Sequence, residues 1–181
     1  RGKTAQFPTM TQELDRVYKQ IPKLKKQPAA AFDLTQKAFQ DALTFDNHYK
    51  EARVNLGITY LNAGLLKKSI DEFQKILTED PTDIQSRLNL AVVYLQTDAK
   101  DKGLESLQEI LRLDPDNIQA HYYLGSVYLK MGANEKAIAE FQCMTKINPQ
   151  GPEAHFSLGE AYRSSGRVEQ AIDEYRKTLK I

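Results

Sequence analysis

The stretch from Ile118 to Pro149 reads IQAHYYLGSVYLKMGANEKAIAEFQCMTKINP, and its spacing decides the fold. In its first half, Tyr123 and Val127 recur at the interval of a helical turn and mark a wide apolar face. Gly125 lies on this face. Glycine costs a free helix about 1 kcal/mol against alanine, so we expect a packing reason for it. A second apolar stripe follows and ends at Pro149, which cannot continue a helix. The stretch therefore predicts two helices joined by a short turn.

The same pattern recurs every 34 residues, in copies that begin at Lys50, Ile84, Ile118 and Pro152. We number positions within each copy from its first residue. Position 8 is small and position 11 is tyrosine: Gly57, Ala91, Gly125 and Gly159, then Tyr60, Tyr94, Tyr128 and Tyr162. Position 20 is small and position 24 is large: Ser69, Gly103, Ala137 and Ala171, then Phe73, Leu107, Phe141 and Tyr175. Phased copies of so long a pattern indicate a repeat protein.

These residues closely resemble the tetratricopeptide repeat family. The resemblance implies an all-α, right-handed superhelical solenoid of helix–turn–helix hairpins. We expect first helices near 50–63, 84–97, 118–131 and 152–165, and second helices near 67–79, 101–113, 135–147 and 169–180. The second copy departs most from the pattern, because Asp98 stands where the other copies have a turn glycine. Aspartate tolerates the left-handed conformation better than most residues, so we expect a poorer turn there.

The repeat also predicts the domain organisation, with repeats at 50–83, 84–117, 118–151 and 152–181, the last truncated at its C-terminal end. Residues 1–8 are expected to be a disordered tail. Residues 9–49 are expected to form a divergent helix pair that caps the array, with a first helix at Met10–Ile21 and a basic connector at Pro22–Pro28. No polar capping helix follows the last repeat, so we expect that the natural protein continues or that this end meets another molecule.

Composition excludes several classes of protein. The net charge is +1, so no overall electrostatic argument favours nucleic acid. No apolar run approaches the ~20 residues of a membrane span, so no direct membrane insertion is expected. The single cysteine, Cys143, excludes an intramolecular disulfide. The first residue is Arg1, so a targeting segment could have been removed, and both a cytoplasmic and a bacterial envelope location stay open.

The resemblance places positions 2, 5, 6, 9, 12 and 13 of each first helix on the concave face of the array. The partner-binding residues expected from these positions are Val54, Asn55, Ile58, Asn62, Leu88, Asn89, Val92, Gln96, Tyr122, Tyr123, Ser126, Lys130, Phe156, Glu160 and Arg163. The apolar members are expected to form an exposed strip, and such strips usually mark a partner site. Packing between adjacent first helices is the alternative reading. Asn55 and Asn89 share position 6, where an amide can pair with an extended peptide backbone. The expected function is a non-catalytic scaffold that binds a peptide segment of a partner protein.

Catalysis and cofactor binding have weaker support. His121 and His155 both take position 4, but no third metal ligand is evident, so a structural role is favoured over a metal site. The chaperone carboxylate clamp of the family needs cations where this chain has Val54 and Gln119, so a free carboxylate terminus is not the expected ligand. No cofactor is expected. Two alternative functions stay open: self-assembly through the ends of the array, and recruitment of substrate within a larger protein.

Overall fold

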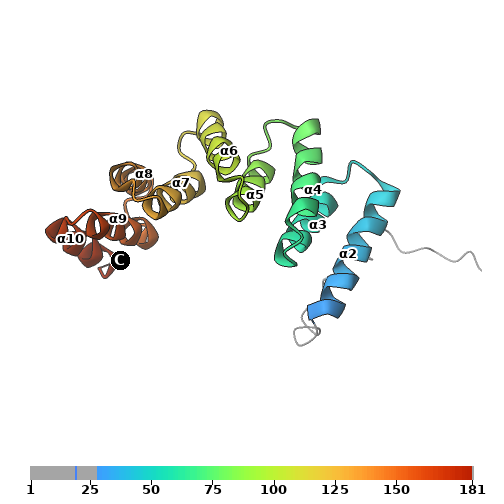
Figure 1. Cartoon of the computed structure of the whole chain (residues 1–181), viewed down its shortest axis with the longest axis horizontal. Coiled ribbons are helices and arrows are strands. Elements are labelled where there is room, and N and C mark those ends of the chain that lie inside the picture. The colour runs from blue at the N-terminus through green and yellow to red at the C-terminus, as the bar shows by residue number, and fades with distance from the viewer. Residues whose placement is uncertain (1–18, 20–27, 181) are drawn as a thin grey trace, which may run out of the picture. The chain divides into compact units, whose positions relative to one another are not determined.

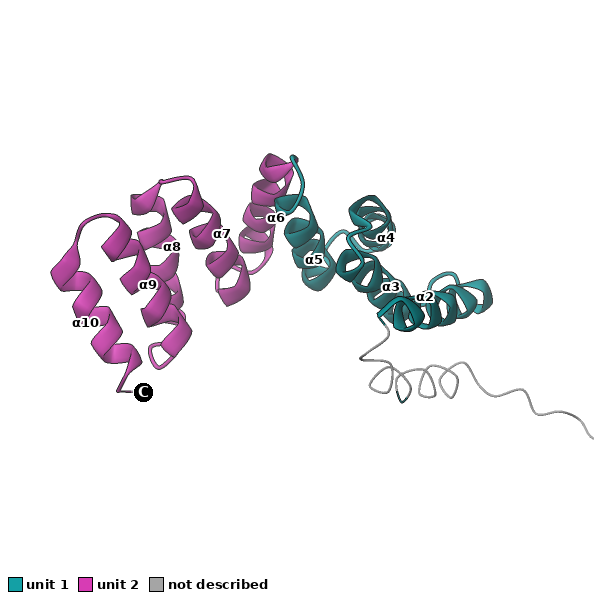
Figure 2. Ribbon diagram, turned by 60° about the horizontal axis from the view of Figure 1, so that its bottom comes forward, with its two compact units in different colours: residues 1–98 teal, residues 99–181 magenta. Residues whose placement is uncertain are grey.

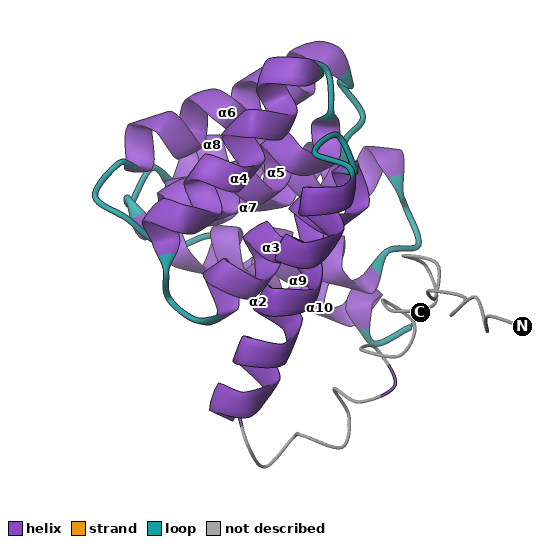
Figure 3. Cartoon of the chain, turned by 90° about the vertical axis from the view of Figure 1, so that its right-hand side faces the viewer, coloured by secondary structure: helices purple, strands orange, loops and turns teal. Residues whose placement is uncertain are grey.

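The computed structural model describes residues 19 and 28–180, and within them the chain consists of helices and loops with no strand (Figures 1 and 3). The helices are α2 (Pro28–Phe45), α3 (Lys50–Asn62), α4 (Leu66–Glu79), α5 (Ile84–Leu95), α6 (Lys100–Leu113), α7 (Ile118–Lys130), α8 (Asn134–Ile147), α9 (Pro152–Ser164) and α10 (Val168–Thr178). From α3 onwards, each helix begins and ends within two residues of the limits that the repeat predicts. The all-α fold and the positions of the eight repeat helices are therefore confirmed.

Three of the expectations for the N-terminal region cannot be compared with the structure. The tail at 1–8 lies outside the described residues, as do the helix at Met10–Ile21, except for Lys19, and the basic connector, except for Pro28. Within the part of the chain that is described, no helix combines the length and the apolar character that a membrane span requires.

Two compact units divide the chain at the loop after α5 (Figure 2). Unit 1 comprises residues 1–98, and within it α2 packs on α3, α3 on α4, and α4 on α5. Its core joins Phe39 of α2 to Leu56 and Tyr60 of α3. Unit 2 comprises residues 99–181, and each of its helices packs on the next, from α6 to α10. Its core includes Phe141 of α8 and Leu158 of α9.

The glycine at position 8 lies beneath the aromatic ring at position 24. A Cβ atom built on Gly125 would lie 2.5 Å from the Phe141 ring, which is closer than any real carbon contact. The same holds between Gly159 and Tyr175, where the distance would be 2.7 Å. The packing reason expected for Gly125 is therefore the approach of a ring to the helix backbone.

A left-handed glycine closes the turn between the two helices of most hairpins. Gly132 has φ +73°, and its N–H donates to the carbonyl of Leu129 at 3.0 Å, which ends α7. Gly64 and Gly166 have the same conformation, and among the described residues only glycines have positive φ. Asp98 thus does not adopt the left-handed conformation, which costs an L-residue about 1 kcal/mol or more. The second hairpin has a turn of a different kind from its neighbours.

Side chains at the end of one repeat cap the first helix of the next. The Asp83 carboxylate accepts from the backbone N–H of Ser86 at 2.7 Å, and the Asn117 amide oxygen accepts from that of Ala120 at 3.0 Å. Such caps are worth about 1 kcal/mol each. Helix α9 begins instead with Pro152, a residue whose missing N–H costs nothing in the first turn.

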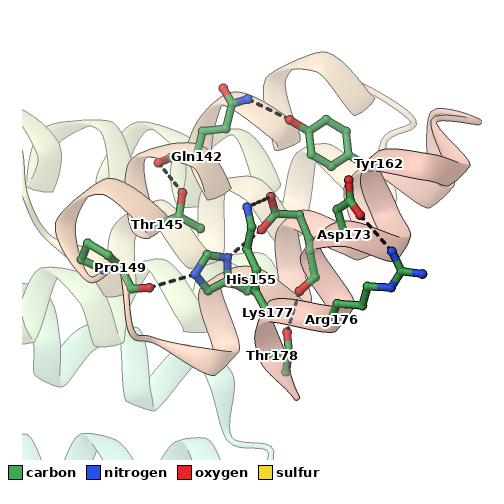
Figure 4. A network of polar contacts seen from close by, with 10 residues as sticks. Gln142, Thr145, Pro149, His155, Tyr162, Asp173, Arg176, Lys177 and Thr178 are labelled. Carbon is green, nitrogen blue, oxygen red and sulfur yellow. Dashed lines mark hydrogen bonds and ion pairs between the residues drawn. The ribbon is translucent and has the colours of Figure 1, made fainter. Parts of the chain in front are cut away.

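A recurrent hydrogen bond joins neighbouring hairpins. Gln74 of α4 donates its amide to the hydroxyl of Tyr94 on α5 at 2.9 Å, and Gln142 of α8 donates to Tyr162 on α9 at 3.0 Å (Figure 4). Gln40 of α2 makes the same bond to Tyr60 on α3 at 3.1 Å. Helix α2 therefore contacts α3 through the same hydrogen bond that joins a second helix to the next first helix.

Candidate functional site

An apolar groove of about 660 Å³ opens on unit 2 between α7 and α9. Helices α7 and α9 are in contact with each other and with α8 (Figure 2). The groove is lined by Ile118, Gln119, Tyr122 and Tyr123 of α7, Pro152, Glu153, Phe156 and Ser157 of α9, Met144 of α8 and Thr178 of α10. Ile118, Tyr122 and Phe156 are exposed. The groove therefore presents two aromatic rings and an aliphatic side chain to solvent at one place.

The helical period turns these rings towards solvent. Ala120 and Leu124 of α7 are buried, and Tyr122, halfway between them in sequence, lies on the opposite side of the helix. The same reasoning applies to Phe156 on α9, between the buried Ala154 and Leu158. Tyr122 is 43% exposed and Phe156 is 52% exposed, which is unusual for side chains of this size.

Neighbouring aromatic residues support both rings. Tyr122 packs edge-on against Tyr123, with ring centroids 5.6 Å apart. Phe156 packs against Tyr175 of α10, with ring centroids 5.9 Å apart. Contacts of this kind contribute about 1 kcal/mol beyond area burial, so they hold the exposed rings in place.

Tyr175 is itself fixed by a polar cluster on α9. Its hydroxyl donates to Glu160, and the Arg163 guanidinium pairs with the same carboxylate at 2.7 Å. Hydrogen bonds from Arg163 and from Tyr175 hold the pKa of Glu160 below its ordinary value. Burial raises the pKa of Tyr175, and its bond to Glu160 raises it further, so the hydroxyl keeps its proton. Glu160 and Arg163, expected as partner contacts, are thus already paired with each other.

The groove gathers only some of the residues expected on the binding surface. Tyr122, Tyr123 and Phe156 line it. Ser126 is half-buried and Lys130 is exposed elsewhere on α7. On α3 and α5 of unit 1, Val54, Asn55, Ile58 and Val92 are half-buried, and Asn62 and Gln96 are exposed.

Two expectations about α5 need correction. Leu88 is only 4% exposed, so the expectation that it contributes to an exposed strip is wrong. Helix α5 packs on both α3 and α4, and Leu88 has almost no access to solvent. The amide nitrogen of Asn89 is buried without a hydrogen-bond partner, so a peptide backbone could reach it only if the surrounding side chains moved.

Sequence reasoning missed the walls of the groove. Met144 and Thr178 share position 27 of the second helices, which the concave-face rule for first helices does not cover. Ile118 and Pro152 share position 1. An apolar residue at the start of two successive first helices could have indicated that these helix starts contribute to the groove.

Each histidine is bound on both sides, by a carboxylate of its own hairpin and by a carbonyl of the preceding loop. The Nδ1 atom of His155 lies 2.6 Å from the Glu174 carboxylate, and its Nε2 atom lies 2.9 Å from the Pro149 carbonyl oxygen (Figure 4). His121 makes the equivalent contacts to Glu140 at 2.7 Å and Pro115 at 3.0 Å. Neither ring has a nitrogen left for a metal, and no group of three or more His, Cys, Asp or Glu side chains in the described residues is placed to hold one.

Arginine fills the same place in the first repeat. Arg53 pairs with Glu72 at 3.1 Å and donates to the carbonyl of Asn47. Asn47 lies six residues before Arg53, the same spacing that separates Pro149 from His155. Position 4 is therefore a structural bridge that ties the preceding loop to both helices of a hairpin, and this is the role of the histidines.

A second depression, of about 400 Å³, lies on α9 and α10 and is polar. Its charged side chains are largely paired with one another, Arg176 with Asp173 at 3.4 Å and Lys177 with Glu174 at 2.7 Å. It offers less to a ligand than the apolar groove does.

Comparison with known families and structures agrees with the repeat pattern. Residues 66–122 match the family described as Tetratricopeptide repeat, and residues 99–181 match the Bacterial transcriptional activator domain. A crystal structure of MamA aligns with a TM-score of 0.72 and 29% identity, over 86% of this chain and 91% of that chain. Together with the repeat pattern, these matches support a protein of the tetratricopeptide repeat family.

Two further solved structures are similar to it. A second crystal structure of MamA aligns with a TM-score of 0.74 and 28% identity, over 95% of this chain and 91% of that chain. TTC0263, a thermophilic TPR protein of Thermus thermophilus, shares the fold, with a TM-score of 0.69 and 22% identity over 95% of this chain and 91% of that chain. Curated protein sequences give no match. The tetratricopeptide repeat match and these neighbours support a scaffold for protein interactions in general.

Proposed function

We propose that the groove between α7 and α9 binds a short segment of a partner protein. The observation that carries the proposal is the exposure of Tyr122 and Phe156, one repeat apart, over a single apolar groove. Exposed apolar patches of this kind usually mark interaction sites, and aromatic side chains supply much of the binding energy at such sites.

Each residue class has a distinct role in the proposed complex. Tyr122 and Phe156 are the apolar anchors, braced from behind by Tyr123 and Tyr175. Gln119 is exposed in the same groove, and its amide supplies a donor and an acceptor for an extended peptide backbone.

The size of the rings sets the expected affinity. An aromatic side chain carries about 150–250 Å² of surface, so covering the exposed half of each ring removes about 100 Å² from water. At about 25 cal/mol per Å² this gives about 2.5 kcal/mol for each ring, or about 5 kcal/mol for both. With backbone hydrogen bonds added, a micromolar Kd, about −8 kcal/mol, is expected for a reversible adaptor.

The test is a peptide-display selection against the wild-type chain, followed by calorimetric titration of the selected peptides. Tyr122→Ala and Phe156→Ala should each raise Kd tenfold or more. Phe45→Ala is the matched control, because Phe45 is 86% exposed at the end of α2 and lies outside the groove. If both groove variants bind the selected peptides as tightly as Phe45→Ala does, the groove is not the binding site.

The half-exposed faces of α3 and α5 are proposed as a further contact surface. Val54, Asn55 and Ile58 on α3 and Val92 on α5 retain accessible surface, unlike Leu88. Selections made with the groove variants would reveal this surface, since peptides that bind to it would be unaffected by Tyr122→Ala.

Self-association is a second candidate, favoured by the outer side of α10. Ile172 is 43% exposed, whereas Ile138, at the same repeat position on α8, is 4% exposed within the core of unit 2. A second copy could cover Ile172. Sedimentation across a concentration series tests this, and a constant monomer mass for wild type and Ile172→Arg alike would exclude it.

A further inference from the structure

We infer that the segment bound in the groove carries a lysine or arginine next to its apolar anchor, and that this cation pairs with Glu153. The inference rests on the proposed function and adds the chemistry of the partner. Of the ten described residues that line the groove, Glu153 is the only charged one. An apolar groove with one carboxylate at its wall selects against acidic segments and favours basic ones.

Glu153 has a carboxylate to offer. It is exposed, and it has no hydrogen-bond or ion-pair partner among the residues that the structure describes. Three other carboxylates on the helices around the groove are engaged: Glu160 with Arg163, Glu174 with His155, and Glu140 with His121. A cation seated in the groove would therefore meet its free carboxylate at Glu153.

The spacing on α9 places this carboxylate beside an exposed ring. Glu153 and Phe156 are three residues apart on one helix, so their side chains lie on the same side of α9, one turn apart. The methylene stem of a lysine or arginine can lie on the Phe156 ring while its charged head reaches the Glu153 carboxylate. Charge-assisted hydrogen bonding and the attraction of a cation to an aromatic face then act together.

A carboxylate at the position of Glu153 also stabilises its helix, so the test needs a control for that effect. A carboxylate in the first turn of a helix interacts favourably with the helix dipole, and Glu51, Glu135 and Glu169 occupy first turns in the same way. Glu51 even shares repeat position 2 with Glu153, yet it does not line the groove. Glu51→Gln is therefore a matched control, because it removes the same charge from the same place on a first helix.

The test uses three pools of synthetic nine-residue peptides. All pools carry leucine and phenylalanine at the same positions, and the other positions are lysine and arginine in the first pool, serine and glutamine in the second, and aspartate and glutamate in the third. Binding of each labelled pool is measured by fluorescence polarisation against wild type, Glu153→Gln, Glu51→Gln and the Tyr122→Ala Phe156→Ala double variant. Circular dichroism confirms that each variant is folded.

Wild type and Glu51→Gln should bind the basic pool at least fivefold more tightly than the neutral pool, and Glu153→Gln should lose this preference. Equal binding of the basic and neutral pools by wild type would overturn the inference, as would a preference that survives Glu153→Gln. In either case the proposed function stands if the double aromatic variant loses binding of every pool. Pools that bind wild type no better than the double aromatic variant would overturn the proposed function and this inference together.

Discussion

Replacing Gly125 by alanine tests the packing that defines each hairpin. The new methyl group would lie 2.5 Å from the Phe141 ring, although carbon atoms in ordinary contact are about 3.5–4.0 Å apart. The ring would have to retreat by about 1 Å. Phe141 is buried against the core of unit 2, so the retreat would disturb other packed side chains.

Two opposing effects determine how much folding stability Gly125→Ala loses. Alanine is favoured over glycine within a helix by about 1 kcal/mol. Overpacking a well-filled core costs about 1–3 kcal/mol, and the depth of this overlap points to the upper part of that range. Packing therefore outweighs propensity, and Gly125→Ala should destabilise the protein by about 1–2 kcal/mol.

A second substitution should relieve the overlap. The second repeat carries Ala91 and Leu107 at the two positions that Gly125 and Phe141 hold in the third. Phe141→Leu alone should cost about 1 kcal/mol through lost packing. Combined with Gly125→Ala it should cost no more than it does alone, since the smaller side chain leaves room for the methyl group. The double-mutant cycle should then show a coupling of about 1–2 kcal/mol.

Urea denaturation followed by circular dichroism gives the four free energies of the cycle, with pre-transition and post-transition slopes fitted separately for each protein. A Gly125→Ala variant as stable as wild type would refute the overlap with Phe141, because helix propensity would then outweigh packing. Additive changes in the free energy of unfolding would also refute the overlap, since they would mean that the side chains at positions 125 and 141 do not contact each other.

Three further substitutions test other features by urea denaturation. Burial alone would raise the pKa of Asp83, but hydrogen bonds from Lys50 and from the start of α5 bring it below its ordinary value. The charged pair of Asp83 and Lys50 therefore stabilises the fold fully above about pH 4, and its contribution falls as the pH drops further. Between about pH 7 and about pH 3, the Asp83→Asn variant should therefore lose less stability than wild type does. His155→Leu removes the hydrogen bonds to Glu174 and to the Pro149 carbonyl, while Lys177 still pairs with Glu174, so it should cost about 1–3 kcal/mol; no measurable loss would argue against the bridge. Gly132→Ala should cost about 1 kcal/mol through its left-handed backbone alone, because a Cβ there would touch nothing within 4 Å; no loss would mean that the turn relaxes.

The helices could be predicted from the sequence because their signals are local and repeated. A small residue and a ring sixteen positions apart, as in Gly125 and Phe141, recur in phase with the tyrosines and with the prolines that end the hairpins. The sequence could predict that the turn at Asp98 differs from the turns that contain glycine. It could not predict the conformation of Asp98, which avoids the left-handed backbone because that conformation is costly for an L-residue.

The site was less predictable because it depends on contacts between elements. The histidine bridges need a carboxylate nineteen residues away, as in His155 and Glu174, and the two meet only when the hairpin closes. The burial of Leu88 depends on how closely α5 lies against α3 and α4, which a repeat pattern does not specify. Met144 reaches the groove from a second helix, where a rule about first helices does not apply.

The hydrogen bond from glutamine to tyrosine between hairpins also bears on how such a chain can change in evolution. Donor and acceptor lie twenty residues apart, as Gln74 and Tyr94 do, and a complete repeat carries one of each. Deleting or duplicating a block of 34 residues would bring a new glutamine opposite a new tyrosine and keep the chain in phase. An insertion of any other length between the two would separate them. A chain of this kind could thus lengthen or shorten by whole modules at little cost, whereas smaller changes of length would be tolerated best in the turns within hairpins.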